Sequence, residues 1–326
     1  MLKFIFGLPS SGKTTTVLNL IKQKVDLEKQ VVLIVPEQFS FQTERSILHI
    51  LGDDNANKVH VLSFTRLYDE ISKTVGGICG KLLCDSDKII LMNRVLSSHE
   101  NELLVWGKYA HSLNFSKSIL DTIGEFKINA ITSDDIRKAA LISETKNLQN
   151  KLLDIALIYD NYNAVLGEKY IDPVDKLTKV FRDLEKVEYF KNKTVFFDSF
   201  KAFTGQQFKI IDRILNQADD VFVAINNDTQ NQLDFDVFHN LRKNISKLEN
   251  MVKSKIQFKM PSDVISVISS IKSDIHSSSF LVISFLPIFG SKIVYNFSVN
   301  GRAKNMTIYI PAEKDNKLLN PANASI

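Results

Sequence analysis

The chain has 326 residues, 44% of them hydrophobic and 24% charged, which is enough to bury one large core or two modest ones. Its formal net charge of +4 permits a polyanionic partner without requiring one. The only cysteines are Cys79 and Cys84, and the six histidines are scattered, so the sequence predicts free thiols and no closed metal site. The function must therefore be argued from motifs.

The first predicted element is a buried strand at 2–6, followed by a loop that matches the pattern G-x-x-x-x-G-K-[ST] at every position. The loop consists of Gly7, Leu8, Pro9, Ser10, Ser11, Gly12, Lys13 and Thr14. In such loops the backbone N–H groups and the next helix N-terminus surround phosphates. A helical pattern over 13–24 follows in the required order. We expect Lys13 to reach the β- and γ-phosphates of ATP and Thr14 to ligate Mg²⁺, the alternative being an ordinary Ser/Gly turn before a helix.

Two apolar runs, 2–6 and 280–290, are candidates for a signal peptide or a membrane-spanning segment. The first is shorter than the roughly 7 to 15 residues of a signal-peptide core and runs directly into the loop. The second is shorter than the roughly 18 residues that span a bilayer, and it contains Pro287. We therefore expect a cytoplasmic protein without a membrane partner.

Further strands are predicted at 31–35 and 59–62, each followed by a helical pattern. The helix after Pro36 is expected to begin near Ser40 and to end at the turn-forming sequence of 52–55. Because these strands are continuous Val, Ile and Leu runs, they favour a parallel sheet that is covered on both faces.

The sequence between about 67 and 191 is helical in pattern, with no convincing strand. Amphipathic stretches lie near 88–96, 116–126, 134–141, 148–165 and 173–187. The sheet pattern resumes with a strand at 194–197, a helix at 204–215 and a strand at 221–225. We therefore predict an α/β fold in which a large helical insertion interrupts a parallel sheet.

Asp198 follows the strand at 194–197, as does the Walker B carboxylate that holds Mg²⁺ opposite the loop threonine. The signal is weaker than the loop, because Asp also begins turns and helices. Motor ATPases often place Glu directly after this Asp, whereas Ser199 stands here. The pattern thus supports nucleotide binding better than hydrolysis.

Four blocks resemble one family, the AddB (or RexB) component of bacterial ATP-dependent helicase/deoxyribonuclease complexes. They are GLPSSGKTTT from Gly7, LIVPEQFSFQTE over 33–44, VLSFTRLYDEI over 61–71 and VFFDSFKAFTGQQ over 195–207. The resemblance extends to about residue 258. It implies a P-loop NTPase sheet of the superfamily 1 helicase type, and it implies that Ser199 stands where the family commonly has glycine.

The resemblance also implies a role in double-strand-break repair and recombination, with an AddA-type partner subunit supplying the main motor. The loops after the second and third strands would face single-stranded DNA, with Arg66 and Thr65 contacting phosphate and aromatic rings stacking on bases. Packing of these rings in the core remains the alternative. The candidate residues are Gln38, Phe39, Phe41, Ser63, Phe64, Thr65 and Arg66.

Family members are much longer, and their nuclease motif and iron–sulfur cysteines lie in a region that we do not find here. With two cysteines, this chain is expected to hold no such cluster and to lack nuclease activity. We predict a nucleotide-binding domain over 1–258 and an atypical tail over 259–326. In the tail, 280–290, 293–299 and 306–310 could pair as a hairpin, or the segment could be foreign or frameshifted.

Two other classes of function remain open. Small-molecule kinases also begin with such a loop, but they usually add an arginine-bearing lid, and no such cluster is found. A non-catalytic, decayed scaffold would keep the loop without a working site.

Overall fold

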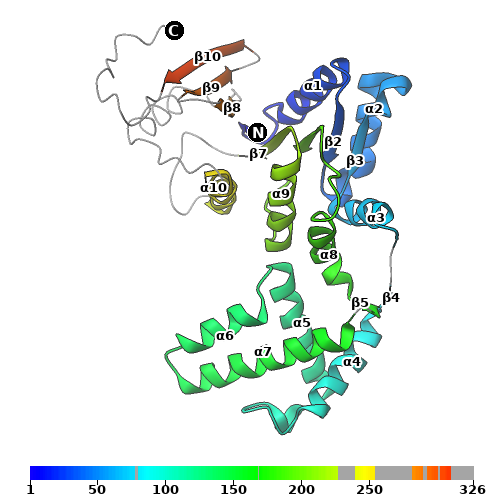
Figure 1. The fold of residues 1–326 in the computed structure, drawn as a ribbon, viewed down its shortest axis with the longest axis vertical. Helices are drawn as coiled ribbons and strands as arrows, with labels where there is room; N and C mark the ends of the chain where they lie inside the picture. Colours follow the sequence, from blue (N-terminus) through cyan, green and yellow to red (C-terminus); the bar gives the residue numbers. More distant parts are fainter. Residues whose placement is uncertain are drawn as a thin grey trace. The chain divides into compact units, whose positions relative to one another are not determined.

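The computed structural model describes residues 1–77, 80–167, 169–226 and 239–253, and the backbone of 281–288, 292–299 and 302–309. The chain forms two compact units (Figure 1). The first, here called the sheet unit, consists of 1–66, 188–203 and 211–326. The second, the helical unit, consists of 67–187 and 204–210.

The sheet unit contains five parallel strands in the order β1-β7-β6-β2-β3. Their bounds are β1 Leu2–Gly7, β2 Gln30–Ile34, β3 Val59–Leu62, β6 Lys193–Phe197 and β7 Asp220–Asn226. Every predicted strand of this set is present, and the predicted α/β class with a mostly parallel sheet is confirmed. The continuous Val, Ile and Phe runs are buried on both faces, as a covered parallel sheet requires.

The helices α1 (Lys13–Asp26) and α2 (Ser40–Ala56) cover one face of this sheet. Val17 and Ile21 of α1 and Ile47 of α2 pack with the strand residues in a single apolar cluster. Within α2, Gly52 has φ 72° and ψ 171° and breaks the helix, where the sequence indicated a turn. Because all five strands run in parallel, the loops that follow them meet at one edge of the sheet.

Three antiparallel strands continue the sheet beyond β1: β8 (Leu281–Ile288), β9 (Lys292–Val299) and β10 (Arg302–Tyr309). β8 pairs with β1, and β9 pairs with both β8 and β10. A hairpin was one expectation for this region, but its membership of the main sheet was not predicted. The proposed boundary at 258 lies outside the described residues.

The helical unit consists mainly of helices. Its helices include α4 (Asp85–Ser98), α5 (Leu113–Ile128), α6 (Ser133–Leu141), α7 (Lys146–Leu166) and α8 (Lys176–Asp183). α6 and α7 pack side by side (Figure 1). Leu96, Ile123 and Tyr162 lie in its core. None of the helices within the described residues is long and apolar enough to cross a bilayer.

One prediction for this region was wrong. Between 67 and 191 the sequence indicated an almost entirely helical pattern with no convincing strand, but two short strands, β4 (Lys81–Leu82) and β5 (Tyr170–Ile171), form a parallel pair. Strands of two residues have no measurable periodicity, so the pattern could not reveal them.

Two further helices connect to the sheet unit. α3 (Phe64–Thr74) begins directly after β3, and α9 (Gly205–Gln217) follows β6. The first residues of α9 belong to the helical unit and the rest to the sheet unit.

Candidate functional site

The loop between β1 and α1 has a backbone that few sequences adopt. Ser10 and Gly12 both have left-handed φ angles, 62° and 85°. A Cβ added to Gly7 would lie 2.3 Å from Ser11 Oγ, so a larger residue at position 7 would force the Ser11 side chain to move. The backbone at position 12 thus favours glycine directly, and a small residue at position 7 leaves room for Ser11.

Thr14 and Asp198, which are 184 positions apart in the chain, meet at the carboxyl edge of the sheet. Thr14 Oγ1 donates a hydrogen bond of 2.9 Å to Asp198 Oδ2. The backbone N–H of Asp198 donates to the carbonyl of Ile34 at 3.1 Å, which continues the β6–β2 ladder. Asp198 is 5% exposed, whereas Thr14 is exposed. A carboxylate and a hydroxyl side by side are oxygen ligands of the kind that Mg²⁺ prefers.

Lys13 folds back over its own loop. Its Nζ donates to the carbonyl oxygen of Leu8 at 2.5 Å. Burial lowers the pKa of Lys13, and the nearby charge of Asp198 acts in the opposite direction. Lys13 and Thr14 thus both have internal partners that an incoming ligand would replace.

Ser199, the residue after Asp198, has a left-handed φ of 65°. Its hydroxyl donates to Asp198 Oδ2 at 3.3 Å, so this one oxygen accepts hydrogen bonds from both Ser199 and Thr14. A left-handed backbone carries no steric cost for glycine but does for serine. This geometry gives a physical reason for the glycine that the family resemblance implies at this position.

The loops after β2 and β3 are joined by a charged cluster around Arg66. Ser63 donates its hydroxyl proton to the carboxylate of Glu37, and the backbone N–H of Arg66 donates to Ser63 Oγ at 3.1 Å. The Arg66 guanidinium pairs with Glu44 and lies 3.8 Å from Glu37 Oε1 through its Nε. The candidate arginine is therefore already paired with two carboxylates, which sequence reasoning did not foresee.

Residues 4–273 match the family model described as "ADDB, N-terminal". The chain belongs to this family. The resemblance inferred from the four sequence blocks is confirmed.

Curated relatives are named as the B subunits of ATP-dependent helicase/deoxyribonucleases. The chain is 34% identical over 253 residues to the protein of Clostridium acetobutylicum, which covers 76% of this chain and 22% of that protein. It is 33% identical over 258 residues to that of Clostridium botulinum strain Loch Maree, which covers 77% of this chain and 22% of that protein. It is 30% identical over 268 residues to that of Thermoanaerobacter sp. strain X514, which covers 81% of this chain and 23% of that protein. The chain thus spans less than a quarter of the length of these relatives.

The aromatic residues of this ADDB N-terminal chain differ in exposure. Phe39 is 36% exposed and Phe41 68% exposed, and Gln38 and Thr65 are exposed as well. Phe64 is only 7% exposed, with its ring centroid 5.7 Å from that of Phe200. Phe64 therefore packs in the core, which is the alternative that the sequence left open, and it presents no face to a base in this structure.

Two observations concern metal binding by the described residues. No group of three or more His, Cys, Asp and Glu side chains in that part of the chain is arranged to hold an ion. Cys84 is a free, exposed thiol, and Cys79 lies outside the described residues. A cation at Asp198 would thus depend on further oxygen ligands from a bound phosphate or from water.

Proposed function

We propose that this chain binds ATP with Mg²⁺ through the loop 7–14 and Asp198, as the nucleotide-binding part of a helicase–nuclease subunit that acts in DNA double-strand-break repair and recombination. The observation that carries the proposal is the 2.9 Å contact between Thr14 Oγ1 and Asp198 Oδ2. It joins the phosphate-loop motif to an acidic residue that directly follows β6.

The shape of the loop supports a phosphate as the ligand. Ser10 and Gly12 have the left-handed backbone that is found in loops whose N–H groups bind anions. The buried hydroxyl of Ser11 has no hydrogen-bond partner in the described structure, and buried polar groups are normally paired. A phosphate group bound in the loop would supply acceptors that this geometry leaves missing.

The chemistry of the site favours binding over rapid turnover. ATP carries a γ-phosphate whose transfer needs a positioned water, and a carboxylate beside the Walker B position commonly holds that water. Here Ser199 occupies the position, and its hydroxyl is engaged with Asp198. We propose that Lys13 and Thr14 hold the nucleotide, that Asp198 orients the cation, and that residues 1–258 form the binding domain.

The Mg²⁺ dependence of ATP affinity tests this assignment, measured by titration calorimetry with and without a chelator. The wild-type chain is expected to lose affinity when Mg²⁺ is removed. Thr14→Val and Asp198→Asn should bind weakly in both conditions and lose most of that difference. If both variants keep the wild-type response to Mg²⁺, the proposed roles of Thr14 and Asp198 are wrong.

We further propose that the loops after β2 and β3 contact single-stranded DNA. Exposed Phe39 and Phe41 supply faces on which bases can stack, and Gln38 and Thr65 are exposed polar residues. The relatives are named as one of the subunits of an enzyme, which supports a complex with a second subunit. We propose that this second subunit is of the AddA type and acts with this chain in the cytoplasm.

Substitution of the most exposed ring tests the DNA contact. Phe41→Ala should weaken binding of a fluorescent single strand by about 1–3 kcal/mol, the usual contribution of one stacked base. Leu48→Ala, an exposed apolar side chain on the same helix, is the matched control and should bind as the wild type does. Equal binding by Phe41→Ala and the wild type would exclude a stacking role.

A further inference from the structure

The strand β7 separates the loop at 7–14 from Asp198 in the sheet, and it ends in a polar residue, Asn226. We propose that the side-chain amide of Asn226 contacts the terminal phosphate of the bound nucleotide and gives this chain a preference for a nucleoside triphosphate over the diphosphate. The inference rests on the proposed function, because it needs a nucleotide in the loop at 7–14. It adds a residue through which the site responds to the number of phosphates.

The order of the strands places the end of β7 between the loop and Asp198. β7 pairs with β1 on one side and with β6 on the other, and all three strands are parallel. The loop at 7–14 begins at the last residue of β1, and Asp198 directly follows β6. Because the carboxyl ends of parallel strands share one edge, Asn226 lies at that edge between these two groups.

The register shows how far along this edge Asn226 reaches. Asn226 is the partner of Gly7, the first residue of the loop. On the other side, Val223 is the partner of Phe197, the residue before Asp198. Asn226 therefore extends two residues, or roughly 7 Å, beyond the level of Asp198 in the direction of the strands. A ligand that lies beyond the Asp198 carboxylate at this edge would come next to the Asn226 side chain.

Asn226 also lies on the face of the sheet that α1 covers. Successive side chains of a strand alternate between the two faces. Phe222 and Ala224 of β7 pack in the same apolar cluster as Val17 of α1. Since Asn226 comes two positions after Ala224, its side chain lies on that face, where the loop leads into α1.

The same alternation places Asp198 and the start of the loop on this face. Phe196 of β6 and Ile5 of β1 belong to the same apolar cluster, and Asp198 and Gly7 each follow two positions later. The 2.9 Å hydrogen bond that Asp198 accepts from α1 agrees with this placement. Three adjacent strands thus present Gly7, Asn226 and Asp198 on one face at one edge.

The chemistry of the Asn226 amide suits contact with a phosphate. Its Nδ2 carries two donors and no charge, and a donor to an anionic oxygen forms a charge-assisted hydrogen bond. Asn226 is partly exposed, so a ligand can reach it without unfolding of the strand. In the proposed site Lys13 reaches the γ-phosphate and Asp198 orients the cation, which puts that phosphate between them and beside the end of β7. A diphosphate lacks this group, and hence the contact distinguishes the two nucleotides.

The affinities for ATP and ADP, each with Mg²⁺ and measured by titration calorimetry on the full chain, test this role. The wild type is expected to bind ATP more tightly than ADP. Asn226→Ala should weaken ATP binding by about tenfold, the loss expected for one hydrogen bond to a charged group, and should change ADP binding by less than about twofold. A loss confined to the triphosphate separates a contact with the γ-phosphate from general damage to the site.

Two further variants sharpen the result. Asn226→Asp keeps the size of the side chain but replaces its donors with a negative charge, so it should weaken ATP binding more than Asn226→Ala does. Asn57→Ala is the control, because Asn57 is exposed and precedes β3 at the opposite edge of the sheet. This variant should bind both nucleotides as the wild type does.

The outcomes separate this inference from the nucleotide site itself. Equal weakening of ATP and ADP binding in Asn226→Ala, or an unchanged affinity for ATP, overturns the role of Asn226 and leaves the nucleotide site intact. So does a wild type that binds ATP and ADP equally. Absence of binding of either nucleotide by the wild type rejects the nucleotide site and this role together.

Discussion

The sheet unit and the helical unit each bury a carboxylate, but they satisfy it with different partners. Asp198 of the sheet unit is 5% exposed and accepts from two side-chain hydroxyls. Asp154 of α7 is 1% exposed and accepts from three consecutive backbone N–H groups, those of Leu104, Val105 and Trp106, at 2.8 to 3.2 Å. Hydroxyls can rotate away when a ligand arrives, whereas backbone donors cannot move without local unfolding. The type of partner, more than burial, therefore separates a candidate binding group from a structural one.

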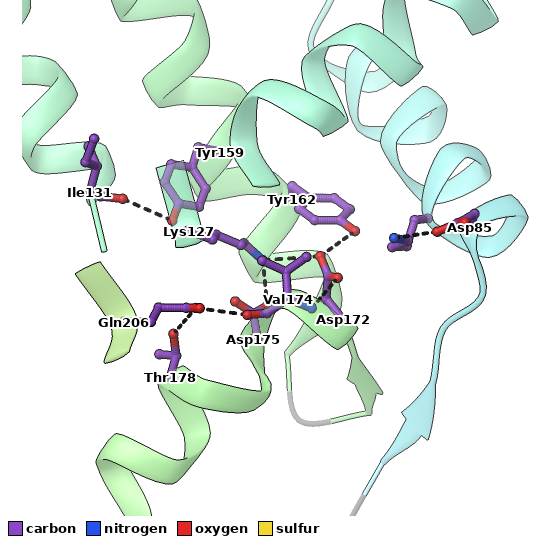
Figure 2. A network of polar contacts seen from close by, with 11 residues as sticks. Asp85, Lys127, Ile131, Tyr159, Tyr162, Asp172, Val174, Asp175, Thr178 and Gln206 are labelled. Atoms are coloured by element: carbon purple, nitrogen blue, oxygen red, sulfur yellow. Dashed lines mark hydrogen bonds and ion pairs between the residues drawn. The ribbon is translucent and has the colours of Figure 1, made fainter. Parts of the chain in front are cut away.

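The largest expected effect lies in the buried ion pairs of the helical unit. Figure 2 shows Lys127 of α5 beside two carboxylates, with Nζ 2.5 Å from Asp175 Oδ2 and 3.5 Å from Asp172 Oδ2. Lys127→Met leaves Asp172 and Asp175 without their cation, and breaking such a buried pair costs about 3–5 kcal/mol of unfolding free energy. Urea denaturation at pH 7 measures this loss. A loss below about 1 kcal/mol would mean that these groups behave as an exposed pair does.

The pH dependence of the Lys127→Met effect follows from the pKa of Asp175. Burial raises that pKa above its ordinary value of 3.8, and Lys127 opposes the rise. Without Lys127 the folded-state pKa increases further, and the penalty comes from the ionised form. The destabilisation should therefore shrink as the pH falls from 7, and it should be lost only below the unfolded-state pKa of 3.8, where Asp175 is protonated in both the folded and the unfolded state. Urea denaturation of the wild type and of Lys127→Met at pH 5 and at pH 7 measures this change, and a loss of unfolding free energy that is equal at both pH values would contradict it.

A pair of substitutions tests the contrast between the carboxylates directly. Asp154→Asn places an amide against three backbone donors and should lower the unfolding free energy by about 2–3 kcal/mol. Asp198→Asn meets two hydroxyls that can reorient, so its loss should stay below about 1 kcal/mol. Thermal denaturation of both variants without ligand gives the ranking. If both substitutions lower the unfolding free energy equally, the type of hydrogen-bond partner does not distinguish Asp198 from Asp154.

The smallest expected effect is at Ser199. Ser199→Gly relieves the left-handed strain but adds entropy to the unfolded chain, so a net stabilisation of about 0.5–1 kcal/mol is expected. Ser10→Gly, at the other left-handed serine near the site, provides a comparison in the loop. A destabilised Ser199→Gly would show that the Ser199 hydroxyl contact outweighs the backbone strain.

The sequence predicted the sheet well because buried parallel strands are continuous apolar runs. Val59–Leu62 was predicted without error, and the strand before Asp198 was found within one residue. The loop at 7–14 and the approach of Asp198 to Thr14 were also foreseeable, since the carboxyl ends of parallel strands share one edge.

The polar network around Lys127 in the helical unit (Figure 2) was not foreseen. Lys127, Asp172 and Gln206 lie far apart in the sequence, each is an ordinary residue for its local pattern, and only tertiary packing brings them together. One signal was available, because the block at 195–207 that resembles the family extends well past Asp198 to Gln206. The pairing of Arg66 with Glu37 and Glu44 was also missed, because only tertiary packing brings these residues together. The two blocks that contain them, 33–44 and 61–71, both carry the family resemblance, but nothing in the sequence indicated that they meet.

The central claim is that the loop at 7–14 binds a nucleotide through Lys13. The most direct test is the affinity of the full chain for ATP with Mg²⁺, compared between the wild type, Lys13→Ala and the control Lys22→Ala, which alters an exposed lysine of the same helix. We predict saturable binding by the wild type and by Lys22→Ala, and loss of binding in Lys13→Ala. Absence of binding by the wild type, or unchanged binding by Lys13→Ala, would contradict it.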